Sequence, residues 1–102
     1  MAGMRLKDYI ERLTKEEYEE VFGNIEKEEK KLRAFLGKLD EHLLDPVATM
    51  LNDTFDMPAD DFNVTDFIVE LYKCQKADFL YEDVNDCIDD IKMFLSEEGD
   101  AF

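Results

Sequence analysis

The sequence predicts an all-α fold, a compact bundle of five or six short helices in a single domain over residues 1–102. Apolar residues recur three and four positions apart along most of the chain, which is the spacing that gives a helix one buried face. No alternating apolar and polar run lies beside an Asn-Gly or Asp-Gly turn, so β-hairpins are not expected. With 102 residues and 45% apolar composition, the chain can bury one modest core without a disulfide or a metal.

The first part of the chain predicts two short helices followed by a break. Leu6 to Leu13 forms the first helical pattern, and Thr14 with Glu17 has the spacing of a capping box that begins a second helix. Gly23 and Asn24 then indicate an interruption.

A longer helix is predicted from Ile25 through Leu43. Gly37 lies within this stretch, but an interior glycine costs only about 1 kcal/mol relative to alanine, so we expect the helix to continue. Asp45 followed by Pro46 is typical of an N-cap with proline at the first helical position, and a new helix is predicted to begin there.

Residues 53–63 show no period and predict the main surface loop, with Asn63 or Thr65 capping the next helix. The last two helices are predicted from their apolar faces, and Gly99 is expected to end the second of them. These faces consist of Phe67, Ile68, Leu71 and Tyr72 in the first helix, and of Val84, Cys87, Ile88, Ile91, Phe94 and Leu95 in the second.

The two parts of the domain differ sharply in charge. Residues 1–44 carry 9 Lys/Arg and 11 Asp/Glu, for a net charge of −2, whereas residues 45–102 carry 3 and 16, for a net charge of −13. The first part mixes its charges, as in the run from Glu26 to Lys31, in the manner of an exposed helix. Solubility alone requires no such segregation, so the acidic part predicts a basic binding partner.

The candidate binding residues are the carboxylates of this acidic part. Those of the last helix recur at three, four and seven residues on the side opposite the apolar face, so they should form a row of like charges. Duplex DNA presents a phosphate about every 3.4 Å along each strand, and such a row can approximate that charge. The row consists of Glu82, Asp83, Asp86, Asp89, Asp90 and Glu97, and Asp60, Asp61, Asp66, Glu70 and Asp78 are expected to broaden it if the neighbouring helix packs alongside.

Three apolar residues of the acidic loop, Phe55, Met57 and Phe62, are candidate contact anchors beside the charge. The alternative is that they cover the core beneath the loop.

Cofactor, metal and catalytic sites are not expected. An EF-hand pattern started at Asp61 fails at its Gly and Glu positions, and one histidine with two distant cysteines makes no zinc set. His42 has no nucleophile motif around it and is predicted to lie at a surface or helix end. Cys87 falls on an apolar helix face and predicts a buried thiol, whereas Cys74 is less clearly placed. No membrane span or signal peptide is recognised, so a soluble, cytoplasmic protein is expected.

In its composition and in the region from Asp45 to Glu98, the chain resembles the small acidic DNA-mimic inhibitors of phages and mobile elements. That class includes anti-restriction proteins and several anti-CRISPR proteins. The resemblance implies a protein that occupies a nucleic-acid-binding site, without catalysis and without a cofactor.

The leading hypothesis is therefore a stoichiometric inhibitor that docks its acidic face on a basic nucleic-acid-binding protein, such as a bacterial defence nuclease or CRISPR effector. It is expected to be a monomer or dimer that does not bind nucleic acid directly. The alternative is a helical adaptor or small subunit that binds a partner, or itself, through an apolar face rich in Leu32, Phe35, Leu36 and Leu39. An enzyme is the least favoured hypothesis, because no base is paired with an activated nucleophile or metal.

Overall fold

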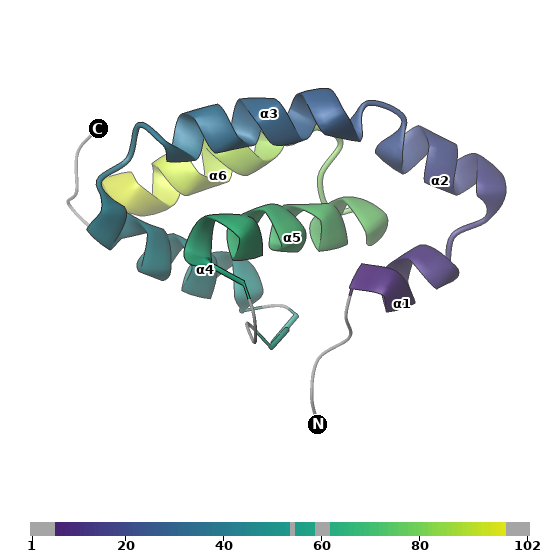
Figure 1. Cartoon of the computed structure of the whole chain (residues 1–102), viewed down its shortest axis with the longest axis horizontal. Helices are drawn as coiled ribbons and strands as arrows, with labels where there is room; N and C mark the ends of the chain where they lie inside the picture. The colour runs from purple at the N-terminus through teal and green to yellow at the C-terminus, as the bar shows by residue number, and fades with distance from the viewer. Residues whose placement is uncertain (1–5, 54, 59–61, 98–102) are drawn as a thin grey trace.

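Helix α5 (Val64–Ala77) lies at the centre of the fold (Figure 1). The computed structural model of the chain describes residues 6–53, 55–58 and 62–97, and this part contains helices and turns but no strand. α5 contacts α1 (Leu6–Glu11), α2 (Lys15–Phe22), α3 (Ile25–Leu36) and α4 (Leu44–Asn52). The all-α fold predicted from the sequence is confirmed.

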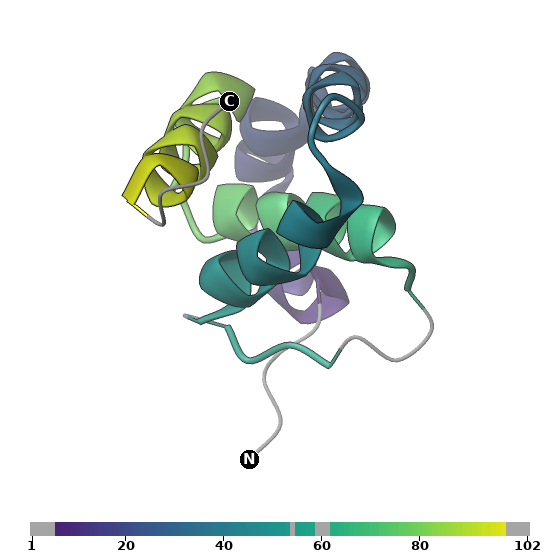
Figure 2. The ribbon, with the colours of Figure 1, turned by 90° about the vertical axis from the view of Figure 1, so that its left-hand side faces the viewer.

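Helix α6 (Val84–Glu97) lies beside α3 and also contacts α4 (Figure 2). In Figure 1, α3 and α6 cross the upper part of the molecule, and α5 lies below them with α4. Because α6 lies at the edge of the bundle, it presents a long side to solvent, and this side carries its acidic residues.

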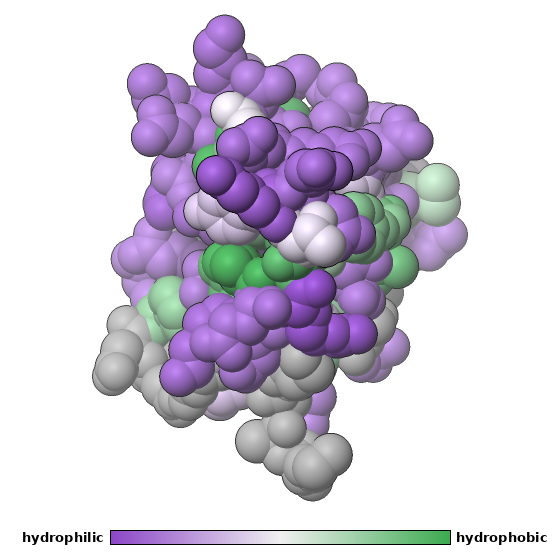
Figure 3. Space-filling view, turned by 90° about the vertical axis from the view of Figure 1, so that its right-hand side faces the viewer, coloured by the Kyte–Doolittle hydropathy of each residue, from purple (hydrophilic) through white to green (hydrophobic). Residues whose placement is uncertain are grey.

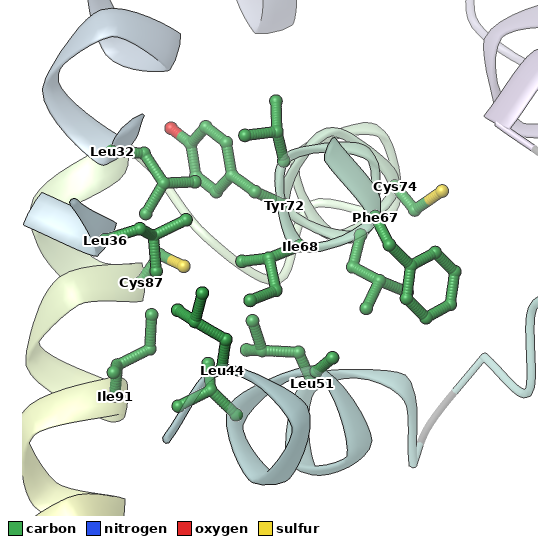
Figure 4. Packing of buried hydrophobic residues seen from close by; sticks show 14 of the residues in the cluster. Leu32, Leu36, Leu44, Leu51, Phe67, Ile68, Tyr72, Cys74, Cys87 and Ile91 are labelled. Atoms are coloured by element: carbon green, nitrogen blue, oxygen red, sulfur yellow. The ribbon is translucent and has the colours of Figure 1, made fainter. Parts of the chain in front are cut away.

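The core forms where α3, α4, α5 and α6 converge (Figure 4). Leu36 from α3, Leu44 from α4, Ile68 from α5 and Ile91 from α6 are all buried. The apolar faces predicted for the last two helices are buried, except that Phe94 is only partly covered. Burial of these faces is the main force that holds the short helices together, since isolated helices of this length are marginal in water.

One ion pair is buried against this core. The Lys76 Nζ of α5 donates to both carboxylate oxygens of Glu28 of α3, at 3.0 and 3.1 Å. Both side chains are largely covered, so the two charges compensate each other in place of water. The pair also fixes α5 relative to α3. The neighbouring Tyr72 hydroxyl is also buried, and burial with the Glu28 charge raises the pKa of Tyr72.

Three predicted helix boundaries are confirmed. Thr14 and Glu17 form the capping box at the start of α2, with the Glu17 N–H donating to Thr14 Oγ1 at 3.1 Å. α2 ends before Gly23, and α3 begins after Asn24. Asn63 caps α5 through its side-chain oxygen, which accepts from the Asp66 N–H at 2.8 Å.

The predicted continuation of α3 through Gly37 is wrong, because α3 ends at Leu36. The N–H groups of Lys38 and Leu39 donate to carbonyls three residues back instead of four, so the chain tightens and turns after the helix. This turn leads into a 3₁₀ helix, η1 (Glu41–Leu43), and buries Leu43.

The predicted N-cap at Asp45 is also wrong. α4 begins at Leu44 directly after η1, so Asp45 and Pro46 lie within its first turn. Pro46 is tolerated there because the first N–H groups of a helix have no partner within it. Burial of Leu43 and Leu44 accounts for the earlier start.

Candidate functional site

The exposed side of α6 and the two residues before it carry the acidic row predicted from the sequence, which consists of Glu82, Asp83, Asp86, Asp89, Asp90 and Glu97. All six are exposed. Val84, Cys87, Ile88, Ile91 and Leu95 point into the core, which forces the intervening residues outward. Asp86, Asp90 and Glu97 share one face at intervals of four and seven residues, with Met93 between them.

Local hydrogen bonds orient three carboxylates of this row. Asp83 Oδ1 accepts from the Asn85 N–H at 2.8 Å, and Asp86 Oδ2 accepts from the Glu82 N–H at 3.0 Å. Asp90 Oδ2 accepts from the Tyr81 hydroxyl at 2.8 Å. These bonds join the segment before α6 to the helix, so the charges are held in place.

Tyr81 supports the row from beneath. Its ring stacks on the buried Tyr72, with ring centroids 6.3 Å apart. Burial, together with the hydrogen bond to Asp90, raises the pKa of Tyr81. The position of Asp90 is therefore fixed by contacts to the core.

Within the described part of the chain, no carboxylate of the acidic row forms a salt bridge. The observed ion pairs lie on α3 and α5 instead, and they join Arg33 to Glu29 and Asp66, Lys73 to Glu29, and Lys76 to Glu28. A cation of α3 does reach α6, but Lys31 Nζ donates to the Asn85 side-chain oxygen and not to a carboxylate of the row.

Asp66 and Glu70 were expected to broaden this row if their helix packed alongside α6, and they do not extend it. Asp66 bonds to Arg33 of α3 at 2.8 Å, so part of its charge is compensated. Glu70 lies near Lys73 and Glu29, and burial raises the pKa of Glu70. The hydrogen bond from Lys73 lowers the pKa of Glu29. These two acids of α5 therefore belong to the side that packs on α3.

The remaining predicted acids fall elsewhere. Asp78 is exposed just after the end of α5. Asp60 and Asp61 lie outside the described residues.

Two of the three predicted apolar anchors are core residues. Phe55 packs edge-on against Tyr9, with ring centroids 5.4 Å apart, and Met57 lies against Cys74 with its sulfur 3.8 Å away. Asn52 holds this segment inward, because its side chain accepts from the Met57 N–H and donates to the Met57 carbonyl.

Phe55 and Met57 are therefore not available for contact with a partner. Phe62 remains, since it is 38% exposed and 6.0 Å from the Phe67 ring between centroids.

The acidic surface continues onto α4, which was not predicted. Asp45 and Asp53 line a hollow of about 570 Å³ together with Phe94 of α6, so this hollow joins the two helices. The same two acids line a larger neighbouring hollow of about 790 Å³, with Asp56 and Phe62. The spacing of Asp45, Thr49 and Asp53, four residues apart, was the available signal.

Several large apolar side chains on the surface were also missed as candidates. Met93 is 60% exposed within the acidic row, and Phe79 and Leu80 are 57% and 52% exposed after α5. No periodic pattern indicated Phe79 and Leu80, because they follow the helix end.

The nucleophile candidates do not form a reactive site. Cys74 and Cys87 are both buried and free, and burial raises the pKa of each thiol to about 12. His42 is exposed in η1, at the predicted kind of position. In the described ranges, no three His, Cys, Asp or Glu side chains are arranged to hold a metal ion.

None of the helices in the described part of the chain has the length and apolarity needed to cross a membrane. Comparisons of the chain with protein-family models, curated proteins and solved structures found no match.

Proposed function

We propose that this protein is a stoichiometric inhibitor that docks its acidic row on the basic nucleic-acid-binding surface of a larger protein. The observation that carries the proposal is the exposed side of α6, where Asp86, Asp89, Asp90 and Glu97 lie without a cation partner among the described residues. A bacterial defence nuclease or CRISPR effector is the partner class that this charge fits best. The action is non-catalytic and needs no cofactor.

The spacing of the charges supports this proposal. An α-helix advances 5.4 Å per turn, so one carboxylate per turn gives a charge density comparable with a phosphate about every 3.4 Å of a DNA strand. The hydrogen bonds to Asp83, Asp86 and Asp90 keep these charges oriented before binding. A charge array that is already ordered loses less conformational freedom on binding.

The cost of the row also supports a binding function. Like charges three or four residues apart destabilise a helix by a few tenths of a kcal/mol per pair. Lys92 is the one cation on α6, and its Nζ lies 6.0 Å from the Phe35 ring of α3. Asp83 and Asp86 lie at the N-terminal end of α6, where negative charge is favourable, so the cost falls on Asp89, Asp90 and Glu97. These three charges are retained, although a mixed-charge surface would keep the protein equally soluble.

The alternative adaptor function gains no support from the apolar side of α3. Leu32 and Leu36 are fully buried, and Phe35 and Leu39 pack against the same core. That side of α3 is occupied within the molecule.

The proposal is tested by affinity capture from nuclease-treated bacterial lysate at about 50 mM and 200 mM salt, a range over which contacts that replace phosphates weaken strongly. We expect recovery of a basic nucleic-acid-binding protein that added DNA or RNA displaces. The triple variant Asp86→Asn, Asp89→Asn, Asp90→Asn should lose this capture, while its asparagines can still accept the hydrogen bonds from Glu82 and Tyr81.

The matched control is Glu16→Gln, Glu19→Gln, Glu26→Gln, which removes three exposed charges from α2 and α3. Capture by this control should remain as in the wild type. Equal capture by the α6 variant, or a partner that nucleic acid does not displace, would contradict the proposal.

A further inference from the structure

Phe79 and Leu80 form an exposed apolar tip at the end of α5. The Phe79 N–H donates to the Lys76 carbonyl at 3.0 Å and the Leu80 N–H to the Gln75 carbonyl at 2.9 Å, which closes the helix in a Schellman motif. In this motif Phe79 takes the left-handed position, with φ of 60°. Glycine is the usual residue there, because a side chain in this conformation is strained.

The tip has two unfavourable features. A bulky residue occupies a strained conformation, and two adjacent large apolar side chains are more than half exposed. Strain and exposed apolar groups of this kind are concentrated at sites of contact with other molecules.

The surface around the tip is hollowed on both sides of Phe79. One hollow of about 490 Å³ is lined by Val21, Tyr81 and Phe79, and a second of about 120 Å³ by Leu13, Ala77 and Phe79. Figure 3 shows an apolar strip between two hydrophilic bands on this side of the molecule. Phe79 therefore separates two recesses that side chains of a partner can enter.

Acidic residues surround these recesses. Glu20 and Glu82 line the larger one, and Glu17 and Asp78 line the smaller, together with Arg12. With Lys76 of the larger recess counted, these four carboxylates face two cations. Lys76 also reaches the larger recess, but its ammonium group is bound to both oxygens of Glu28. The rim therefore favours a partner with positive charge around an apolar centre.

The acidic rim favours one of two candidate partners for the tip, a basic protein over a second copy of the chain. A second copy of the chain would bring another acidic rim and a net charge of −15 against the first, which opposes self-association. A basic partner has the opposite, complementary charge.

The tip is also continuous with the acidic row. Tyr81 follows Leu80 and bonds to Asp90, and the next residue, Glu82, bonds to Asp86 through its N–H. The tip and the row thus belong to one connected surface and can contact the same partner.

We propose that Phe79 and Leu80 insert into an apolar spot framed by Lys or Arg on the basic partner, an inference that rests on the proposed function. The acidic row then accelerates association, and the tip slows dissociation.

The test uses a helical peptide of 14 residues as the probe, with Leu at helical spacing on one face and Lys elsewhere. A second peptide has every Leu replaced by Ser. By fluorescence anisotropy at physiological salt, the wild type should bind the Leu peptide at least about tenfold more tightly than the Ser peptide.

The double variant Phe79→Asn, Leu80→Ser should lose this preference and keep its binding to the Ser peptide. Asparagine is chosen because it tolerates the left-handed conformation. Phe62→Ser, at an exposed aromatic beside other acids, is the matched control and should keep the preference. A double variant that retains the full preference would overturn the role of the tip.

Two further outcomes are distinguishable. The triple asparagine variant of α6 should weaken the binding of both peptides, and unchanged binding of both would count against the acidic row rather than the tip. Sedimentation in about 0.5 M salt, where charges are screened, should show a monomer. A dimer that the tip variant dissociates would overturn the choice of a basic partner in favour of a second copy.

Discussion

At the scale of single residues, backbone conformation and burial set the energies of a few side chains. Phe79 has a φ of 60°, which is the left-handed region. For an L-residue in a helix, this conformation costs about 1 to 2 kcal/mol of stability. Glu70 is a carboxylate whose burial raises its pKa. Each of these two residues destabilises the folded state, so a suitable substitution should increase the free energy of unfolding.

Replacing Phe79 by glycine should therefore give a more stable protein than replacing it by alanine. Both substitutions remove the ring, but only alanine keeps the Cβ that is strained at this φ, so we expect a difference of about 1 kcal/mol in the free energy of unfolding. Urea denaturation of the two variants measures it. Equal stabilities would show that the position is not strained.

Glu70→Gln should stabilise the protein at neutral pH. The raised pKa means that the fold disfavours the ionised carboxylate, a cost that appears as the pH rises through the folded-state pKa. Below the ordinary value of 4.5, Glu70 is protonated in both states, and the variant should match the wild type. Denaturation midpoints from pH 3 to 7 test this, and an advantage that persists at the acidic end would refute the assignment.

The sequence allowed accurate prediction where a residue interacts with near neighbours in the chain. Asn63, one of the two caps predicted for α5, accepts from the N–H of Asp66 three residues ahead. The role of Asp66 depends on Arg33 of α3, 33 residues away in sequence, and that of Glu70 on its burial and on Glu29 of α3. No local pattern in the sequence indicates these contacts. The left-handed Phe79 was not predictable, because the usual signal for that conformation is a glycine.

At the scale of helices, α2 and α3 both end at a glycine that has no positive φ. A Cβ at Gly23 would lie 2.5 Å from the Glu19 carbonyl oxygen, whereas at Gly37 the nearest atom is 3.4 Å away. The two positions have similar backbone angles, but only Gly37 has room for a Cβ atom.

Gly37→Ala should therefore be tolerated or stabilise the protein by about 0.5 kcal/mol, since it restricts the unfolded chain. Gly23→Ala should destabilise it, because backbone atoms must move to admit the methyl group. Thermal denaturation of the two variants compares them directly. The idea fails if Gly23→Ala is the more stable.

Helix boundaries show the same limit of sequence prediction. The capping box at Thr14 is formed by residues three apart and was predicted correctly. The end of α3 at Leu36 and the start of α4 at Leu44 depend on where Leu43 and Leu44 reach the core, which local propensity does not determine. For α6, a regular apolar face predicted both the helix and the exposed side that carries the acidic row.

At the scale of the whole molecule, a net charge of −15 opposes compactness. The double variant Asp89→Asn, Glu97→Gln removes two negative charges and should raise the melting temperature in low salt. Asp89 has acidic neighbours, and Glu97 lies at the helix C-terminus, where negative charge is unfavourable. The gain should shrink in about 0.5 M salt.

The control Glu16→Gln, Glu26→Gln changes net charge equally, but both residues lie in first helical turns, where negative charge is favourable. It should give a smaller gain or a loss. An equal gain from both pairs would mean that total charge alone determines the effect.

The burial of Cys74 in α5 and Cys87 in α6 places a thiol in the central helix and another in the outer one. A thiol reagent in native buffer can modify each only when its helix opens, so the labelling rates report two local opening equilibria. Because α6 lies at the edge of the bundle and contacts chiefly α3 and α4, Cys87 should react before Cys74. A bound partner on the exposed side of α6 would slow the labelling of Cys87 in particular, so the chain contains its own probe of occupancy.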